Sequence, residues 1–244
     1  MSAPDGPVAL VGDAHLREGD AEVGAFVRFL DGLPAEITTL GILGDLFAAW
    51  IGRPELQRPH HRLVVQALRR LRGRGCAILY VEGNHDFFLA PLHAGDPFDR
   101  LAGDALDLRV AGRTLRLEHG DLVNRGDRQY LAWRAVSKNR LLFGLFNLLP
   151  RTARLRIVDR LERSLANTNL DFRTGFPLAA CEVYARERVA SGADIVVFGH
   201  FHDERQFDVE ARGRRGSVFV LPAWRERHRY LRIDPLAEPA FVSA

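Results

Sequence analysis

Five short polar clusters in this sequence combine histidine, aspartate and asparagine with glycine. They are Gly12-Asp13-Ala14-His15, Gly44-Asp45, Gly83-Asn84-His85-Asp86, His119-Gly120-Asp121 and Gly199-His200-Phe201-His202. Carboxylate oxygens, imidazole nitrogens and amide oxygens suit divalent ions such as Mn²⁺, Fe²⁺ or Zn²⁺, whereas a structural zinc site would need clustered thiolates. Seven such ligands suffice for two ions if one carboxylate bridges them. Two neighbouring ions can clamp a phosphoryl group and lower the pKa of a water between them.

Each cluster follows a short apolar run of the kind that forms a buried strand. The runs are VALVGDAH, ITTLGILGD, CAILYVEGNHD, RTLRLEHGD and ADIVVFGHFH. Helical spacing of apolar residues over 22–31 and 60–72 predicts βαβ units in the first half. The later runs SVFVLPAW and YLRID predict a mixed or doubled sheet with helices outside it. Because strand ends of α/β folds converge on one crevice, we expect the five clusters to meet there.

Any one of these clusters on its own is common in an ordinary loop, and a lone histidine usually makes a hydrogen bond without a catalytic or metal-binding role. The signal is the ordered series, in which every cluster terminates an apolar run. The series therefore favours a metal-dependent site over a set of unrelated turns.

The composition predicts one globular domain, since 47% of the 244 residues are hydrophobic. Cys76 and Cys181 lie in apolar runs, so we expect buried thiols and a reducing compartment. We expect neither a signal peptide nor a membrane-spanning segment. The net charge is only +3, but arginines concentrate over 134–163 and 205–232, which suggests a basic surface for an anionic partner.

The five clusters resemble the signature blocks of the calcineurin-like metallophosphoesterases over residues 11–202. The resemblance implies a four-layer α/β/β/α sandwich and a site for two divalent metal ions, with Mn²⁺ the expected ion. Carried over to this sequence, it implies one ion on Asp13, His15 and His202, a second on Asn84, His119 and His200, and Asp45 between them. It also implies that His85 contacts the phosphate or protonates the leaving oxygen, with Asp86 orienting His85.

A second resemblance is more specific. The stretches GDLFAAWIGRP, HGDLVNRGDRQYLAWRAVSKN, LPRTARLRI and VLPAW resemble the UDP-2,3-diacylglucosamine diphosphatases of lipid A biosynthesis. This implies hydrolysis of a pyrophosphate bond, with attack at the α-phosphorus giving UMP and 2,3-diacylglucosamine 1-phosphate (lipid X). It implies a nucleotide-linked glycolipid substrate, and a cytoplasmic enzyme peripherally bound to the inner membrane. The implied substrate contacts are Asn84, His85, Asp127, Tyr130, Arg134, Ser164, Asn167, Arg173 and His200.

Residues 127–175 are expected to form a helical cap inserted in the single domain 1–244. The cap would hold acyl chains on its leucines and phenylalanines and meet anionic lipid with its arginines. The alternative is a pair of amphipathic helices that pack on the core. The sequence departs from the diphosphatases at His85, where arginine is usual, and Arg173 stands in for a cap lysine.

Three other functions stay open at this point. A general phosphomonoesterase or phosphodiesterase would need the same metal ligands, whereas an inactive scaffold would not need the complete ligand set or His85. Nucleic-acid hydrolysis ranks last, because the arginine-rich segment lacks interleaved aromatic residues for stacking on bases. The oligomeric state is not predicted.

Overall fold

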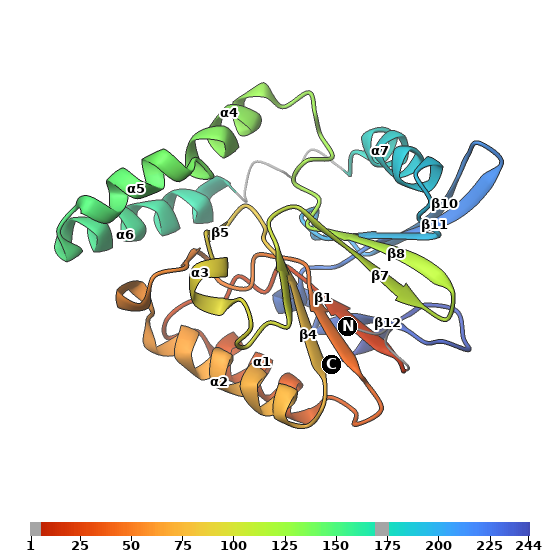
Figure 1. Ribbon diagram of the computed structural model, residues 1–244, viewed down its shortest axis with the longest axis horizontal. Helices are drawn as coiled ribbons and strands as arrows, with labels where there is room; N and C mark the ends of the chain where they lie inside the picture. Colours follow the sequence, from red (N-terminus) through yellow and green to blue (C-terminus); the bar gives the residue numbers. More distant parts are fainter. Residues whose placement is uncertain (1–5, 169–175) are drawn as a thin grey trace.

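The computed structural model describes residues 6–168 and 176–244, except for the side chains of 166–168. Two large sheets lie face to face, and helices cover their outer faces (Figure 1). A further group of helices lies at one end of the molecule, beside the loops that leave the strands.

The first sheet has six strands in the order β13-β12-β1-β2-β4-β6. Strands β1, β2, β4 and β6 run parallel, while β12 is antiparallel to β1 and β13 is antiparallel to β12. Their bounds are Val8–Val11 for β1, Thr39–Ile42 for β2, Ala77–Val81 for β4, Arg100–Ala102 for β6, Arg229–Ile233 for β12 and Ala240–Ser243 for β13. The parallel core follows from βαβ crossovers through α1 (Ala21–Gly32) and α2 (Pro59–Gly73).

The second sheet has five strands in the order β10-β11-β9-β8-β7. Its centre is parallel, with β9 between β8 and β11, and its two edge strands are antiparallel. The bounds are Ala105–Val110 for β7, Arg113–Glu118 for β8, Ile195–Phe198 for β9, Arg205–Ala211 for β10 and Arg214–Val220 for β11. A separate parallel pair joins β3 (Trp50–Ile51) to β5 (Asp86–Phe87).

Three apolar layers hold the sandwich together, and the alternation of side chains along each strand assigns residues to them. On β1, Val8 and Leu10 face the second sheet, while Ala9 packs beneath α1 and α2. On β9, Val197 faces the first sheet, and Phe198 packs beneath α7 (Leu178–Ala190). The order of layers is therefore α/β/β/α, as the sequence predicted.

Three further helices follow β8: α4 (Arg128–Ser137), α5 (Arg140–Leu148) and α6 (Arg151–Thr168). Apolar side chains of α5 and α6 pack on Ile51 and Phe87 of the small sheet. Arg58 at the start of α2 bonds Asp159 of α6. The short elements are η1 (Pro54–Leu56), α3 (Ala90–His93) and α8 (Trp224–Arg227).

The structure confirms the elements on which the site prediction depends. All five polar clusters follow strands, namely β1, β2, β4, β8 and β9, and the two expected helices are α1 and α2. Both cysteines are buried free thiols. Among the described residues, no helix is both long and apolar enough to span a bilayer.

Candidate metal centre

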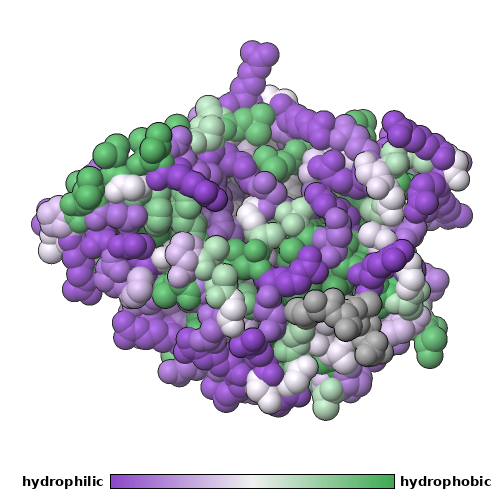
Figure 2. Space-filling model, viewed as in Figure 1, coloured by the Kyte–Doolittle hydropathy of each residue, from purple (hydrophilic) through white to green (hydrophobic). Residues whose placement is uncertain are grey.

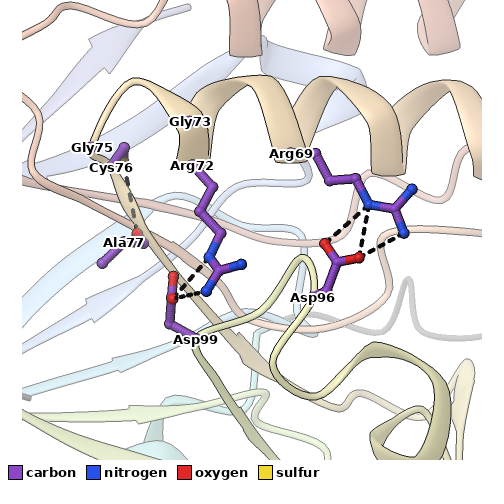
Figure 3. Close-up of a pocket in the computed structure, with 8 residues that line it drawn as sticks. All are labelled: Arg69, Arg72, Gly73, Gly75, Cys76, Ala77, Asp96 and Asp99. Carbon is purple, nitrogen blue, oxygen red and sulfur yellow. Dashed lines mark hydrogen bonds and ion pairs between the residues drawn. The ribbon is translucent and has the colours of Figure 1, made fainter.

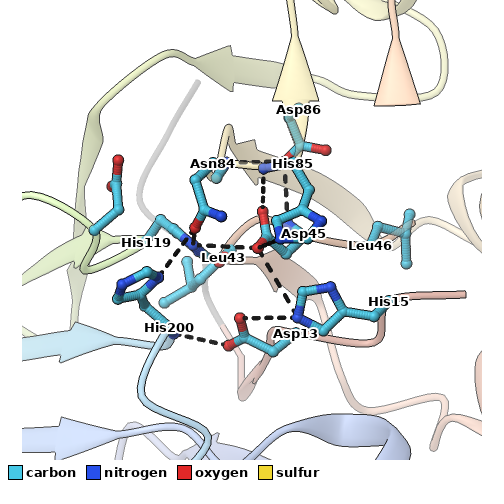
Figure 4. A network of polar contacts seen from close by, with 12 residues as sticks. Asp13, His15, Leu43, Asp45, Leu46, Asn84, His85, Asp86, His119 and His200 are labelled. Atoms are coloured by element: carbon cyan, nitrogen blue, oxygen red, sulfur yellow. Dashed lines mark hydrogen bonds and ion pairs between the residues drawn. The ribbon is translucent and has the colours of Figure 1, made fainter. Parts of the chain in front are cut away.

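The loops after the five strands converge at one edge of the sandwich (Figure 4). Strands β1, β2 and β4 of the first sheet supply Asp13, His15, Asp45 and Asn84. Strands β8 and β9 of the second sheet supply His119, His200 and His202. The site therefore lies where the two sheets meet, and it needs both of them.

Five of these side chains stand on backbone with positive φ, a conformation that costs energy in any residue other than glycine. The φ values are 54° at Asp13, 43° at His15, 53° at Asp45, 69° at His200 and 56° at His202. Such strain persists only where the surroundings impose it. Here each turn aims a polar side chain into the same small volume.

Two glycines make room for the carboxylates. A Cβ added to Gly83 would lie 2.2 Å from Asp45 Oδ1, and one added to Gly199 would lie 2.4 Å from Asp13 Oδ2. Neither carboxylate can move away, because both are fully enclosed. A side chain at either glycine would displace the cluster.

Each carboxylate uses one oxygen to hold a neighbouring loop and turns the other into the cluster. Asp13 Oδ2 accepts the backbone N–H of His200 at 2.9 Å, and Asp45 Oδ1 accepts that of His85 at 2.9 Å. Asp13 Oδ1 has no hydrogen-bond partner although it is buried. The inward oxygens are thus free to bind a cation.

Around these oxygens the imidazoles form two overlapping groups. Asp13 Oδ1 lies 3.8 Å from Nε2 of His15 and 3.5 Å from Nε2 of His202. Asp45 Oδ2 lies 3.9 Å from Nε2 of His15 and 3.5 Å from Nε2 of His119. Asp45 therefore stands between the two groups, the place expected of a bridging ligand.

The second group centres on the amide oxygen of Asn84. This oxygen lies 2.9 Å from His119 Nε2 and 3.0 Å from His200 Nδ1. On its other side, the His119 ring bonds the carbonyl oxygen of Leu43 through Nδ1 at 2.7 Å. A carbonyl only accepts, so Nδ1 carries the hydrogen and Nε2 is left to bind a metal ion.

The ligand atoms fit divalent cations, because the lone pairs of neighbouring nitrogens and oxygens point at one another at close range. His15 Nε2 and His202 Nε2 are only 3.1 Å apart, and His119 Nε2 faces an acceptor oxygen. Such pairs need a proton or a cation between them. Burial lowers the pKa of His15 to about 3, whereas the charges of Asp45 and Asp13 outweigh burial and raise that of His119 to about 9. The carboxylates therefore favour positive charge at His119, whereas burial keeps the His15 ring neutral, the form that binds a metal ion.

His85 lies within reach of the same cluster, and its ring is held by a contact that was not predicted. Its Nδ1 donates to the carbonyl oxygen of Ala48 at 2.6 Å, which turns Nε2 toward Asp45 Oδ2 at 3.6 Å. Asp86 was expected to orient His85, but its Oδ2 instead accepts the backbone N–H groups of Asp45 and Gly83 and the hydroxyl of Tyr80. Asp86 thus positions the loops, and burial raises its pKa to about 7.

Asp121 is a site residue to which sequence reasoning gave no role. It is buried, it accepts the Tyr130 hydroxyl, and it accepts Arg134 Nε at 2.9 Å. The Tyr130 ring lies 6.3 Å from that of His200. The only sequence signal was its place two residues after His119, at the end of the fourth strand run.

Two of the other predicted substrate contacts, Asp127 and Ser164, lie on the helices that follow β8. The Asp127 carboxylate caps α4 by accepting the N–H of Tyr130 at 2.8 Å. Ser164 is exposed on α6, and Asn167 lies in the same helix with its side chain outside the described part. Arg173 falls outside the described residues.

A surface hollow of about 510 Å³ lies between the end of α2 and the start of β4 (Figure 3). Its two arginines are already paired: Arg69 with Asp96 and Arg72 with Asp99, each at 2.8 Å. None of the predicted site residues lines it. The hollow is therefore separate from the metal cluster and carries little unpaired charge.

Comparison with known proteins agrees with this geometry. Residues 6–204 match the calcineurin-like phosphoesterase family, and this range includes all seven predicted metal ligands. The chain belongs to that family.

Several relatives of this calcineurin-like phosphoesterase carry the name UDP-2,3-diacylglucosamine hydrolase. The protein from Pseudomonas putida is 30% identical over 93% of this chain and 95% of its own length. The one from Ralstonia nicotianae is 34% identical over 90% of this chain and 84% of its own. The one from Klebsiella pneumoniae is 29% identical over 92% and 94%. The similarity thus includes the α4–α6 helices as well as the metal loops.

Proposed function

We propose that this phosphoesterase hydrolyses the pyrophosphate bond of UDP-2,3-diacylglucosamine to UMP and 2,3-diacylglucosamine 1-phosphate, a step of lipid A biosynthesis. The relatives named for this substrate match more than nine tenths of the chain in two of the three comparisons above. A general phosphoesterase would need the metal ligands but would have no use for an apolar surface beside them.

The observation that carries the proposal is an apolar helix packed directly on the metal loop. The Phe143 ring of α5 stacks on Phe88 with centroids 4.1 Å apart. Phe88 follows His85 by three residues, and Phe146 continues the same surface. Acyl chains need an apolar surface within reach of the phosphoryl centre, and this arrangement supplies one. We therefore infer that the described part of the expected 127–175 insertion, residues 127–168, forms a cap over the site.

Two divalent ions, with Mn²⁺ favoured by the ligand types, would be held by the seven predicted ligands. When bound, the ions would activate a water and neutralise charge on the phosphoryl group. The chain itself holds the ligand loops in place through Asp86 and the backbone bonds of Asp13 and Asp45. His85, with Nδ1 donating to Ala48, would present Nε2 to the reacting phosphate and, as the doubly protonated imidazolium, would contact it or donate a proton.

Tyr130 and Arg134 converge on Asp121 beside His200, so we assign them to the substrate's nucleotide diphosphate end. Asp127 helps to fix the positions of these two residues, because its carboxylate caps α4. Ser164 would meet the substrate from α6, and the contacts expected of Asn167 and Arg173 fall outside the described part of the chain.

We also propose that the enzyme works at the cytoplasmic face of the inner membrane as a peripheral protein. Apolar side chains gather on the end of the molecule where α5 lies (Figure 2). Leu141 and Leu148 are each 80% exposed and Leu145 is 61% exposed, and the exposed Arg140 and Arg151 flank this stretch in the sequence. An apolar ridge bordered by arginines suits an anionic lipid surface.

Mass spectrometry of the products in ¹⁸O-labelled water tests the proposed reaction. Purified protein with Mn²⁺ should convert the lipid nucleotide to UMP and the lipid monophosphate, with the label in UMP because water attacks the α-phosphorus. Label in the lipid monophosphate would contradict the assigned direction of attack. A small aryl phosphodiester cleaved as fast as the lipid nucleotide would instead favour the general phosphodiesterase.

A further inference from the structure

Lys138 is the only lysine in a chain with 34 basic residues. It lies at the corner between α4 and α5, where it is the C-cap residue of α4. Its side chain is 17% exposed, so the ammonium group lies largely inside the protein. The proposed reaction assigns no role to this side chain.

The Lys138 ammonium contacts three oxygens of the metal loop. It lies 3.0 Å from the carboxylate of Glu82 and 3.1 Å from the carbonyl oxygen of Gly83, and it also bonds the carbonyl oxygen of Asp86. Gly83 and Asp86 flank Asn84 and His85 in sequence. One cation therefore joins both ends of the four-residue segment that carries a metal ligand.

The second carboxylate oxygen of Glu82 bonds the far end of the same loop. Glu82 Oε1 accepts the backbone N–H of Leu89 at 2.7 Å, while Oε2 faces Lys138. The Glu82 side chain is only 8% exposed. Residues 82–89 thus form a loop whose two ends are tied by one carboxylate, and that carboxylate is neutralised from the helical cap.

We propose that Lys138 is a positioning residue that holds the Gly83–Asp86 segment in the shape that Asn84 needs to bind the second metal ion. The inference rests on the dinuclear site of the proposed function. It adds a physical link between the cap and that site, because the ammonium group sits on the α4–α5 corner and its partners sit on the metal loop. Loss of the contact should affect the ion held by Asn84, His119 and His200 and spare the one held by Asp13, His15 and His202.

The geometry explains why lysine stands here in a chain that otherwise uses arginine. Three acceptors converge on one nitrogen, and an ammonium group has three donors on a single atom. A guanidinium group spreads its donors over a plane and matches a carboxylate or phosphate better than a convergent set of oxygens. Arginine at this position would push the segment away from α4.

Titration of metal-free protein with Mn²⁺ alone, followed by calorimetry, tests this inference. In the Lys138→Met variant the second ion should bind at least about tenfold more weakly, the range seen when residues behind metal ligands are replaced. The first ion should bind as in the wild type. The Arg140→Met variant removes an exposed cation from the same cap and should leave both affinities unchanged.

Two more variants separate positioning from stability. Lys138→Met leaves Glu82 buried without its cation, so the double variant Lys138→Met with Glu82→Gln removes the stranded charge and should fold while still binding the second ion weakly. Lys138→Arg keeps the charge and should also lose affinity for the second ion. Unchanged affinity in the double variant, equal weakening of both ions, or full rescue by arginine would each overturn the inference.

The readout is independent of the substrate. A wild-type chain that binds two Mn²⁺ ions but does not cleave the lipid nucleotide would refute the proposed substrate and leave the role of Lys138 testable. A wild-type chain that binds fewer than two ions would refute both.

Discussion

Asp45 lies between the two groups of proposed metal ligands. One of its oxygens is fixed by the backbone of His85, and the other faces the Nε2 atoms of His15, His85 and His119 within 3.9 Å. It is fully buried, so its charge is not screened by water. A carboxylate in this position can hold two cations close together only while it keeps both its charge and its second oxygen.

Replacing Asp45 by asparagine should therefore lower the rate of hydrolysis by about three orders of magnitude or more, because the bridging charge is lost. The fold should persist, since the amide can still accept the N–H of His85. Steady-state rates with Mn²⁺, together with elemental analysis, check this expectation. Asp203→Asn is a suitable control, because Asp203 lies one residue from His202 but pairs with Arg205 at the surface. Near-normal turnover of Asp45→Asn with two bound ions would refute the bridging role.

At the scale of elements, α5 presents two different apolar faces. Phe143 and Phe146 are half-buried against the metal loop and the small sheet, whereas Leu145 and Leu148 point into solvent. The sequence predicted an apolar cluster beside the site, and also left open that the helices only pack on the core. Phe143 and Phe146 pack as the second description says, and a role of the exposed leucines in holding acyl chains stays a prediction.

The double variant Leu145→Gln with Leu148→Gln should bind anionic vesicles weakly and use the diacyl substrate poorly. Each methylene withdrawn from an apolar environment costs about 0.8 kcal/mol, so the ratio of diacyl to aryl phosphodiester rates should fall more than tenfold. The rate on the aryl diester should stay constant, because that substrate does not reach α5. Vesicle sedimentation and the two rates measure these effects.

Leu63→Gln provides the matched control, since Leu63 is 54% exposed on α2. It should change neither vesicle binding nor the ratio of rates. If the α5 variant loses both activities together with thermal stability, the exposed leucines support the fold and not the lipid.

The elements that carry the metal ligands could be predicted because their strands are buried on both faces. Strands β1 and β9 have four buried residues each, so they read as continuous apolar runs that stop at a polar cluster. Edge strand β10 has only Val209 buried and gave no comparable pattern. The contacts of Asp121 and Lys138 depend on the path of α4 past two distant loops, which no local pattern encodes.

At the scale of the whole molecule, the ligands come from two sheets that pack on each other through a shared apolar layer. Binding of ions to the folded state alone should stabilise it, by about 2.7 kcal/mol for one ion at a hundredfold excess over its dissociation constant. Mn²⁺ should therefore raise the melting temperature, and chelation should lower it and abolish hydrolysis reversibly. Scanning calorimetry and activity before and after chelation test this. Full activity in metal-stripped protein would refute the dinuclear site.

A second cluster of histidines, away from the site, makes stability depend on pH. His60, His61 and His93 pack around Phe47 and Trp50, and each is at most 5% exposed. Burial lowers their pKa values to about 4, 2 and 4, although Glu18 near His60 and Asp96 near His93 act in the opposite direction. Arg58, Arg62 and Arg69 reinforce the effect of burial.

The unfolded chain binds protons at these histidines near pH 6.5, whereas the folded chain does not. These neutral histidines therefore contribute fully to the free energy of unfolding above pH 6.5. Their contribution declines as the pH falls toward their folded-state pKa values, by about 1.4 kcal/mol per pH unit for each group. In metal-stripped protein, His93→Leu should lower the slope of the unfolding free energy between pH 6 and 5 by about 1 kcal/mol per pH unit, which is the share of one histidine. Urea unfolding at the two pH values measures it, and an unchanged slope would show that His93 titrates alike in both states.

The order of strands in the first sheet determines the stage of chain synthesis at which the site can form. Strand β1 lies between β2 and β12, so one of the earliest segments of the chain is completed by one of the latest. The ligands follow the same sequence, from Asp13 to His202. A growing chain thus exposes an unfinished sheet edge and a partial set of ligands until its last quarter has emerged, and such long-range pairing slows folding. Each of the two proposed ion sites can therefore be completed only after His200 and His202 have emerged, whereas Asp13, His15 and Asp45 are exposed to metal ions from early in synthesis.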